Sequence, residues 1–208
     1  MPTPEFTRLS EAIEDICNGL MSFNGRPDGD YTAEERMRCQ AFVVFSHAEI
    51  ESYFEKISRR ILDESNTRWQ TSNVPDRVIA TLIAYRGPED IAIPQDPKNP
   101  TKRSNLKDIV ASAYKSHQDA ISSNHGIKKK NIAELLCPLG ILPDDFDEVL
   151  LIQLNNTGER RGDMVHQPAK VSLPKLRDPF SDEMYDIKYL ISEIERFDEK
   201  LIKLELLS

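Results

Sequence analysis

The sequence of 208 residues has few cysteines, few glycines and no long apolar run. Its three cysteines, Cys17, Cys39 and Cys137, are far apart and form no Cys-x-x-Cys pair, which indicates reduced thiols without a disulfide framework. No stretch approaches about 18 consecutive apolar residues, so we expect no membrane-spanning helix and no membrane partner. The N-terminus lacks a basic segment followed by an apolar one, which argues against a secretory signal and predicts a cytoplasmic protein.

Several motifs that carry chemistry are also absent. The sequence contains no GxxxxGK[ST] loop, no GxGxxG fingerprint and no GxSxG elbow. Its four histidines are His47, His117, His125 and His166, and none stands at ligand spacing from another histidine or a cysteine. His47 and Glu51 are four residues apart and could supply two metal ligands, but a satisfied polar pair is the favoured interpretation because no second pair is recognisable. We therefore predict no metal and no cofactor.

Apolar residues instead recur at spacings of three and four, which predicts an all-α bundle of about six or seven helices. The expected helices cover 4–21, 32–63, 76–85, 102–122 and 129–137, with two more beginning at Asp144–Asp145 and near Ser181. Residues 64–75 are expected to form a loop, and residues 155–158 to interrupt a helix. The length suits one domain, 1–208, with an irregular proline-rich insertion at about 86–100.

The net charge of −8, taken whole, argues against a nucleic-acid-binding protein. The charge is unevenly spread, however. Residues 1–63 and 178–208 each carry a net −5, whereas 100–130 carry seven basic against two acidic groups and 157–177 carry five against two. Because salt confines charges to about 8–10 Å, these basic segments could form a local phosphate-binding surface. Solvated helix faces are the equally weighted alternative.

The segment 159–166 places two arginines ahead of a histidine. Arginine offers a permanent charge and a forked donor for phosphate, and histidine can exchange a proton near pH 7. Arg161 precedes His166 by five residues, which on a helix separates them by about 140° and roughly 7–8 Å along the axis. The two side chains would therefore line a groove without stacking directly.

This segment resembles the Arg-x4–6-His motif of the HEPN superfamily of all-helical nucleases and nucleotide-binding domains. Residues 41–55 are similar to the first core helix of that family, and Glu51 best matches its typical glutamate. Residues 124–141 are similar to the stretch before the motif helix in the RiboL-PSP-HEPN and related branches. Gly162 stands where many active members carry Asn, Asp or His, and Asp163 offers a polar group one residue later.

The resemblance implies a metal-independent endoribonuclease that works as a homodimer, with both motifs in one cleft at the two-fold interface. Arg161 is expected to hold the scissile phosphate. His166 is expected to be the general acid or base for attack by the ribose 2′-OH, leaving a 2′,3′-cyclic phosphate and a 5′-OH. Glu51 or His47 would orient these groups.

The implied partners are RNA, a second copy of the chain and an antitoxin or defence-system protein, since the resemblance suggests a toxin or phage-defence effector. The residues expected to guide the RNA backbone are Lys128, Lys129, Lys130 and Arg160. The alternatives are a catalytically inactive HEPN domain that binds nucleotides or a protein, and a helical interaction module in which Arg161 and His166 are structural.

Overall fold

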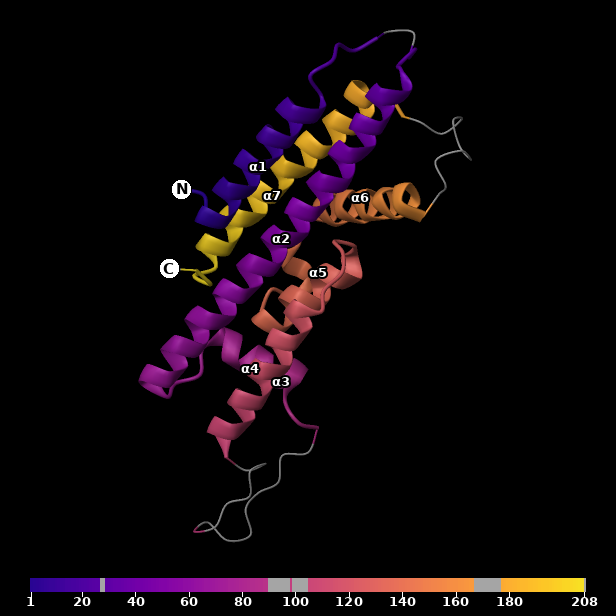
Figure 1. Ribbon diagram of the computed structural model, residues 1–208. Coiled ribbons are helices and arrows are strands. Elements are labelled where there is room, and N and C mark those ends of the chain that lie inside the picture. Colours follow the sequence, from indigo (N-terminus) through magenta and orange to yellow (C-terminus); the bar gives the residue numbers. More distant parts are fainter. Residues whose placement is uncertain (27–28, 90–97, 99–104, 167–176, 208) are drawn as a thin grey trace. The chain divides into compact units, whose positions relative to one another are not determined.

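The computed structural model describes residues 1–26, 29–89, 98, 105–166 and 177–207, and every regular element among them is helical (Figure 1). The α-helices are α1 (Pro4–Leu20), α2 (Ala33–Ser72), α3 (Arg77–Arg86), α4 (Leu106–Ser122), α5 (Lys129–Leu136), α6 (Glu148–His166) and α7 (Tyr185–Lys203). Short 3-10 turns cover Cys137–Leu139 and Pro143–Asp145, and a π-helical turn covers Pro179–Met184. The predicted all-α class is confirmed.

The chain forms two compact units. Unit 1 comprises Met1–Tyr53, Gly126–Lys129 and Asp147–Lys200, and unit 2 comprises Phe54–His125, Lys130–Phe146 and Leu201–Ser208. The helix α2 supplies residues to both. Most of the predicted proline-rich insertion, residues 90–97 and 99–100, lies outside the described residues.

A buried carboxylate joins three segments of unit 1. Thr3 caps α1, because its Oγ1 accepts a hydrogen bond from the N–H of Phe6 at 3.1 Å. Thr3 also donates its own N–H and its hydroxyl to Asp198 on α7, at 2.7 and 2.5 Å. The Tyr53 hydroxyl of α2 donates to the same carboxylate at 2.9 Å. Asp198 is fully buried, so these donors replace the water that its charge would otherwise need.

The long helix α2 begins as predicted but ends later. Thr32 and Glu35 form the expected capping box, with the Thr32 N–H donating to Glu35 at 2.7 Å and the Glu35 N–H donating to Thr32 at 3.2 Å. The loop predicted over 64–75 is wrong, since α2 continues to Ser72. The buried Trp69 packs in the core of unit 2, and this tertiary contact outweighs the high local polarity.

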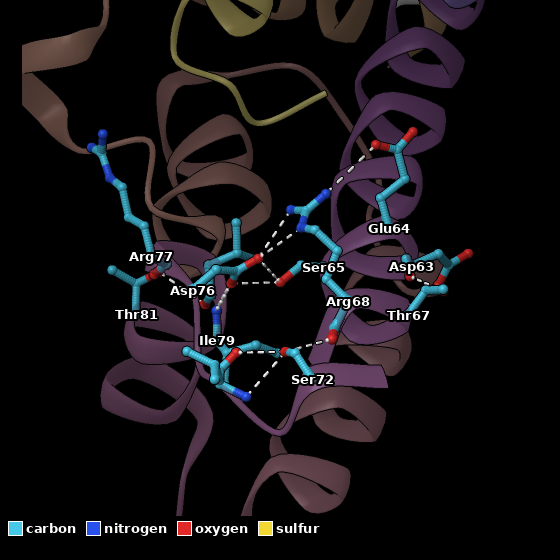
Figure 2. A network of polar contacts seen from close by, with 12 residues as sticks. Asp63, Glu64, Ser65, Thr67, Arg68, Ser72, Asp76, Arg77, Ile79 and Thr81 are labelled. Carbon is cyan, nitrogen blue, oxygen red and sulfur yellow. Dashed lines mark hydrogen bonds and ion pairs between the residues drawn. The ribbon is translucent and has the colours of Figure 1, made fainter. Parts of the chain in front are cut away.

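The end of α2 is tied to the start of α3 by a polar network around Asp76 (Figure 2). Asp76 caps α3 by accepting from the N–H of Ile79 at 2.9 Å. Ser65 donates its hydroxyl to Asp76 at 2.7 Å, and Arg68 donates to the same carboxylate at 3.0 Å. These contacts set the position of α3, and the helix predicted over 76–85 is confirmed.

The motif helix α6 differs from the prediction at its start and in its middle. The start predicted at Asp144–Asp145 is wrong, because Asp145 belongs to a 3-10 turn in which it accepts from the N–H of Leu142 at 3.0 Å. The helix begins three residues later. The interruption predicted at 155–158 is also wrong: Thr157 is buried and the helix is continuous through it. The motif therefore lies on one unbroken helix.

The other helices lie near their predicted places. Within the predicted range 102–122, α4 begins at Leu106 and is capped by Asn105, while residues 102–104 lie outside the described part of the chain. Before α7, Asp178 caps the π-helical turn by accepting from the N–H of Ser181 at 2.8 Å. The α-helical part of the last helix consequently starts at Tyr185, somewhat later than predicted.

Candidate active site

The predicted arginine–histidine motif lies at the C-terminal end of α6, in unit 1. Arg161 is half-buried, and His166 is the last residue of the helix. The side chain of His166 lies outside the described part of the structure. Because α6 is helical across both positions, the two residues are about 140° apart around its axis, as the sequence predicts.

The first arginine of the motif is used inside unit 1. Arg160 forms an ion pair with Glu183 and another with Asp186, the latter at 2.9 Å. Glu183 is 3% exposed, so its charge depends on this partner. Burial lowers the pKa of the Arg160 guanidinium from its usual value. These contacts favour a structural role for Arg160, and its predicted contact with RNA stays a prediction.

The second arginine is arranged differently. No ion pair joins Arg161 to another residue that the structure describes, although it follows Arg160 directly. Its positive charge is nevertheless felt by His47 of α2, whose pKa it helps to lower. Two adjacent arginines thus have different surroundings, and Arg161 keeps its guanidinium available to an anion.

His47 is a buried, neutral histidine beside this arginine. Its side chain is 4% exposed, and its Nδ1 lies 3.7 Å from Oε2 of Glu51 on the next turn of α2. Burial, reinforced by the positive charge of Arg161, lowers the pKa of His47 to about 4. At neutral pH the ring is therefore uncharged and adds no positive charge to the site. The structure thus brings together three of the predicted residues: His47, Glu51 and Arg161.

The side chain of Lys128 packs against α6 at Gly158. A methyl group at Gly158 would lie 2.9 Å from Cγ of Lys128 and 3.7 Å from its Cε, so the aliphatic stem of this lysine crosses α6 at a position without a side chain. Gly158 precedes Arg161 by three residues, which puts both on one face of the helix. Gly158 was predicted to be part of a helix break, so this role was missed, because a glycine in a helical pattern lowers the expectation of a continuous helix.

The remaining predicted residues are exposed. Lys129 begins α5 and belongs to unit 1, whereas Lys130 belongs to unit 2. Asp163 is exposed on α6. At Gly162 an added methyl group would meet nothing within 4 Å, so this position has room for a side chain.

A small cavity of about 40 Å³ lies beside the motif in unit 1. Arg36 and Arg177, which were not among the predicted site residues, line it together with Met164 of α6. Both arginines already have partners: Arg36 donates to the Gly29 carbonyl at 3.1 Å, and Arg177 pairs with an aspartate of α7 at 2.7 Å. The cavity has room for water but not for a nucleotide.

The buried Cys39 is not an activated nucleophile. Burial raises the pKa of the Cys39 thiol to about 11, so it is protonated at neutral pH and a poor nucleophile. Among the described residues, no group of three or more histidine, cysteine, aspartate or glutamate side chains is placed to hold a metal ion. Within the same residues, no helix has the length and apolar character needed to cross a bilayer.

Comparison with known proteins identifies a family. The model of the RiboL-PSP-HEPN family matches residues 6–202, nearly the whole chain. No curated protein and no solved structure matches. The matched region contains α6 with its arginine–histidine motif and the α2 residues beside it. The chain belongs to the RiboL-PSP-HEPN family, within the HEPN superfamily.

Proposed function

We propose that this protein is a metal-independent endoribonuclease that cleaves RNA through attack by the ribose 2′-OH. Membership of the HEPN superfamily already gives an RNA-related or nucleotide-binding role. The observation that carries the finer proposal is Arg161, a half-buried arginine that forms no ion pair with another described residue, five residues before His166 on one helix.

Arg161 would bind the scissile phosphate. A guanidinium can donate two parallel hydrogen bonds to phosphate oxygens and stabilise the charge that develops on them. The neutral His47 beside it supports this role, because a second positive charge at that position would repel Arg161. Glu51, on the same face of α2, would act as a positioning residue.

His166 would move the protons. As the 2′-oxygen attacks phosphorus, a base must take the proton of the 2′-OH, and as the P–O5′ bond breaks, an acid must give a proton to O5′. The products are a 2′,3′-cyclic phosphate and a 5′-OH. One histidine cannot be base and acid in the same step, so two copies of His166, one from each protomer, would divide these tasks.

An exposed apolar stripe on α2 supports the homodimer that this division needs. Met37 and Phe45 are 64% and 53% exposed, and Ala41 and Ala48 lie on the same helix face. Large apolar side chains gathered on one face are typical of protein interfaces. We propose that a second copy covers this stripe. Because an active ribonuclease must be restrained in the cell, an antitoxin or a defence-system partner is the further partner we propose.

The test is cleavage of single-stranded RNA in the presence of a metal chelator. We expect the wild type to leave cyclic phosphate ends and His166→Ala to be inactive. An otherwise identical substrate with 2′-deoxy sugars should stay intact, because it lacks the nucleophile. Cleavage of the deoxy substrate, a requirement for added divalent metal, or undiminished activity of His166→Ala would refute the mechanism. RNA binding without any cleavage would favour the catalytically inactive alternative.

A further inference from the structure

Unit 2 contains a pocket of about 210 Å³ between the C-terminal part of α2 and the beginning of α4. The residues lining it are Asn66, Trp69, Gln70, Asn73, Lys107, Val110 and Ala111. The proposed catalytic residues belong to unit 1, so this pocket is separate from the site described above.

The α2 wall of the pocket is unusual in its chemistry. Its four residues stand at spacings of three, four and seven and therefore share one helix face. Positions of this kind that face a neighbouring helix are usually apolar, yet three of the four are amides. No hydrogen bond joins the side chains of Asn66, Gln70 or Asn73 to another described residue. Each amide therefore has both a donor and an acceptor to offer to a ligand.

The helix also ends at this pocket. Asn73 has a left-handed backbone with φ of 56°, and its N–H donates to the Trp69 carbonyl at 2.8 Å. This closes the last turn of α2 and keeps the Asn73 side chain at the rim of the pocket. Three of the polar residues in the segment 64–75, which was predicted to be a loop, thus line this pocket.

Apart from the three amides, the pocket is lined by apolar side chains and one lysine. Trp69 and Val110 are buried and belong to one core cluster with Ile79. Lys107 is exposed and forms no ion pair with another described residue. No carboxylate lines the pocket, so its charge favours an anion.

We propose that this pocket binds one unpaired nucleotide of an RNA strand. Amide side chains are well suited to the edge of a base, which presents donors and acceptors in one plane. The apolar floor would cover the flat base, and Lys107 would meet its phosphate. The volume lies below that of pockets for drug-sized ligands, which fits one base. The proposal rests on the proposed function for RNA as ligand, and it adds that the RNA is single-stranded.

The experiment uses Trp69, the one tryptophan of the chain, whose fluorescence reports on its surroundings at this pocket. The full-length His166→Ala protein is titrated with single-stranded RNA, with a duplex of the same sequence, with nucleoside 5′-monophosphates and with inorganic phosphate. We expect a saturable change of emission with single-stranded RNA and none with the duplex. Gln70→Ala and Lys107→Ala should each weaken binding by about three- to tenfold. Lys115→Ala, an exposed lysine of α4 outside the pocket, is the matched control.

Two results would overturn the proposal while leaving the proposed function intact. In the first, an independent method shows that RNA binds, but the bound RNA does not change the Trp69 emission, and Gln70→Ala does not weaken the binding. In the second, inorganic phosphate or a monophosphate reproduces the change and RNA does not. Conversely, a saturable change in Trp69 emission with single-stranded RNA, together with a wild type that does not cleave it, would support the pocket and refute the endoribonuclease.

Discussion

Replacing Gly158 with alanine perturbs the proposed RNA site without removing any of its charged groups. The glycine lies inside α6, one turn before Arg161, and the stem of Lys128 crosses the helix there. A methyl group at Gly158 would stand 2.9 Å from Cγ of Lys128, whereas carbon atoms in contact lie about 3.5–4.0 Å apart. Lys128 must therefore move by several tenths of an ångström or more.

Two opposing effects set the stability of Gly158→Ala. Alanine stabilises a helix interior relative to glycine by about 0.5–1 kcal/mol. Overpacking costs about 1–3 kcal/mol where the neighbour is held, but the exposed Lys128 can rotate away and relieve much of this cost. We expect the free energy of unfolding to change by less than about 1 kcal/mol, with Lys128 displaced from α6.

The assay is the salt dependence of single-stranded RNA binding by the His166→Ala protein. Each phosphate neutralised contributes about 0.7 to the slope of log K against log salt. Gly158→Ala and Lys128→Ala should each lower the slope by about this amount, and the two together should lower it no further. Gly162→Ala is the matched control because its methyl group has free space. It should raise Tm by about 1–4 °C and leave the slope unchanged.

Three results would contradict the proposed effect of Gly158 on Lys128. If Lys128→Ala lowers the slope while Gly158→Ala does not, the glycine does not place the lysine. If neither substitution changes the slope, Lys128 contacts no phosphate. If the double variant loses about twice as much as either single variant, the two residues act independently.

Three further predictions concern buried groups. Asp198→Asn should lower the free energy of unfolding by about 2–3 kcal/mol in urea denaturation, because an amide cannot accept all the bonds of the buried carboxylate, and Tyr53→Phe by about 1 kcal/mol. His47 should make unfolding acid-sensitive, because its pKa is lowered in the folded protein and the unfolded chain therefore takes up the proton at a higher pH. Stability that is present above about pH 6.5 is then lost as the pH falls towards 4, and His47→Gln should reduce this fall in Tm. Arg160→Ala should lower Tm because it leaves Glu183 buried without a partner, whereas Arg161→Ala should abolish cleavage with Tm unchanged. Equal Tm values for the two arginine variants would contradict this division.

The helices could be predicted because each buries an apolar stripe that repeats at helical spacing. The errors arose where packing overruled local composition. Residues 64–75 are polar, yet they stay helical because Trp69 packs on Ile79 and Val110. Residues 155–158 look like a break, yet α6 continues through them: Thr157 is buried, and Gly158 packs against Lys128. Neither of these tertiary contacts can be read from the local sequence.

The candidate site could be located from the sequence, but its two arginines could not be told apart. Arg160 and Arg161 are neighbours of identical chemistry, and a helix turns their side chains about 100° apart. Only the positions of the π-helical turn and of α7 decide that Arg160 meets Glu183 and Asp186. The neutral state of His47 was equally hidden, since it results from burial that the sequence does not display.

The same contacts bear on how an acidic chain could bind the RNA that we propose as its substrate. Much of the excess acid near the C-terminus lies on α7 and the turn before it, where several carboxylates are already engaged. Asp186 pairs with Arg160 and Arg177, and Asp198 accepts three internal hydrogen bonds. Arg161 and Lys128, by contrast, form no ion pair with any described residue. Screening removes charges beyond about 8–10 Å, so the field that a phosphate meets at α6 depends on the nearby charges, these two cations among them, and not on the total of −8.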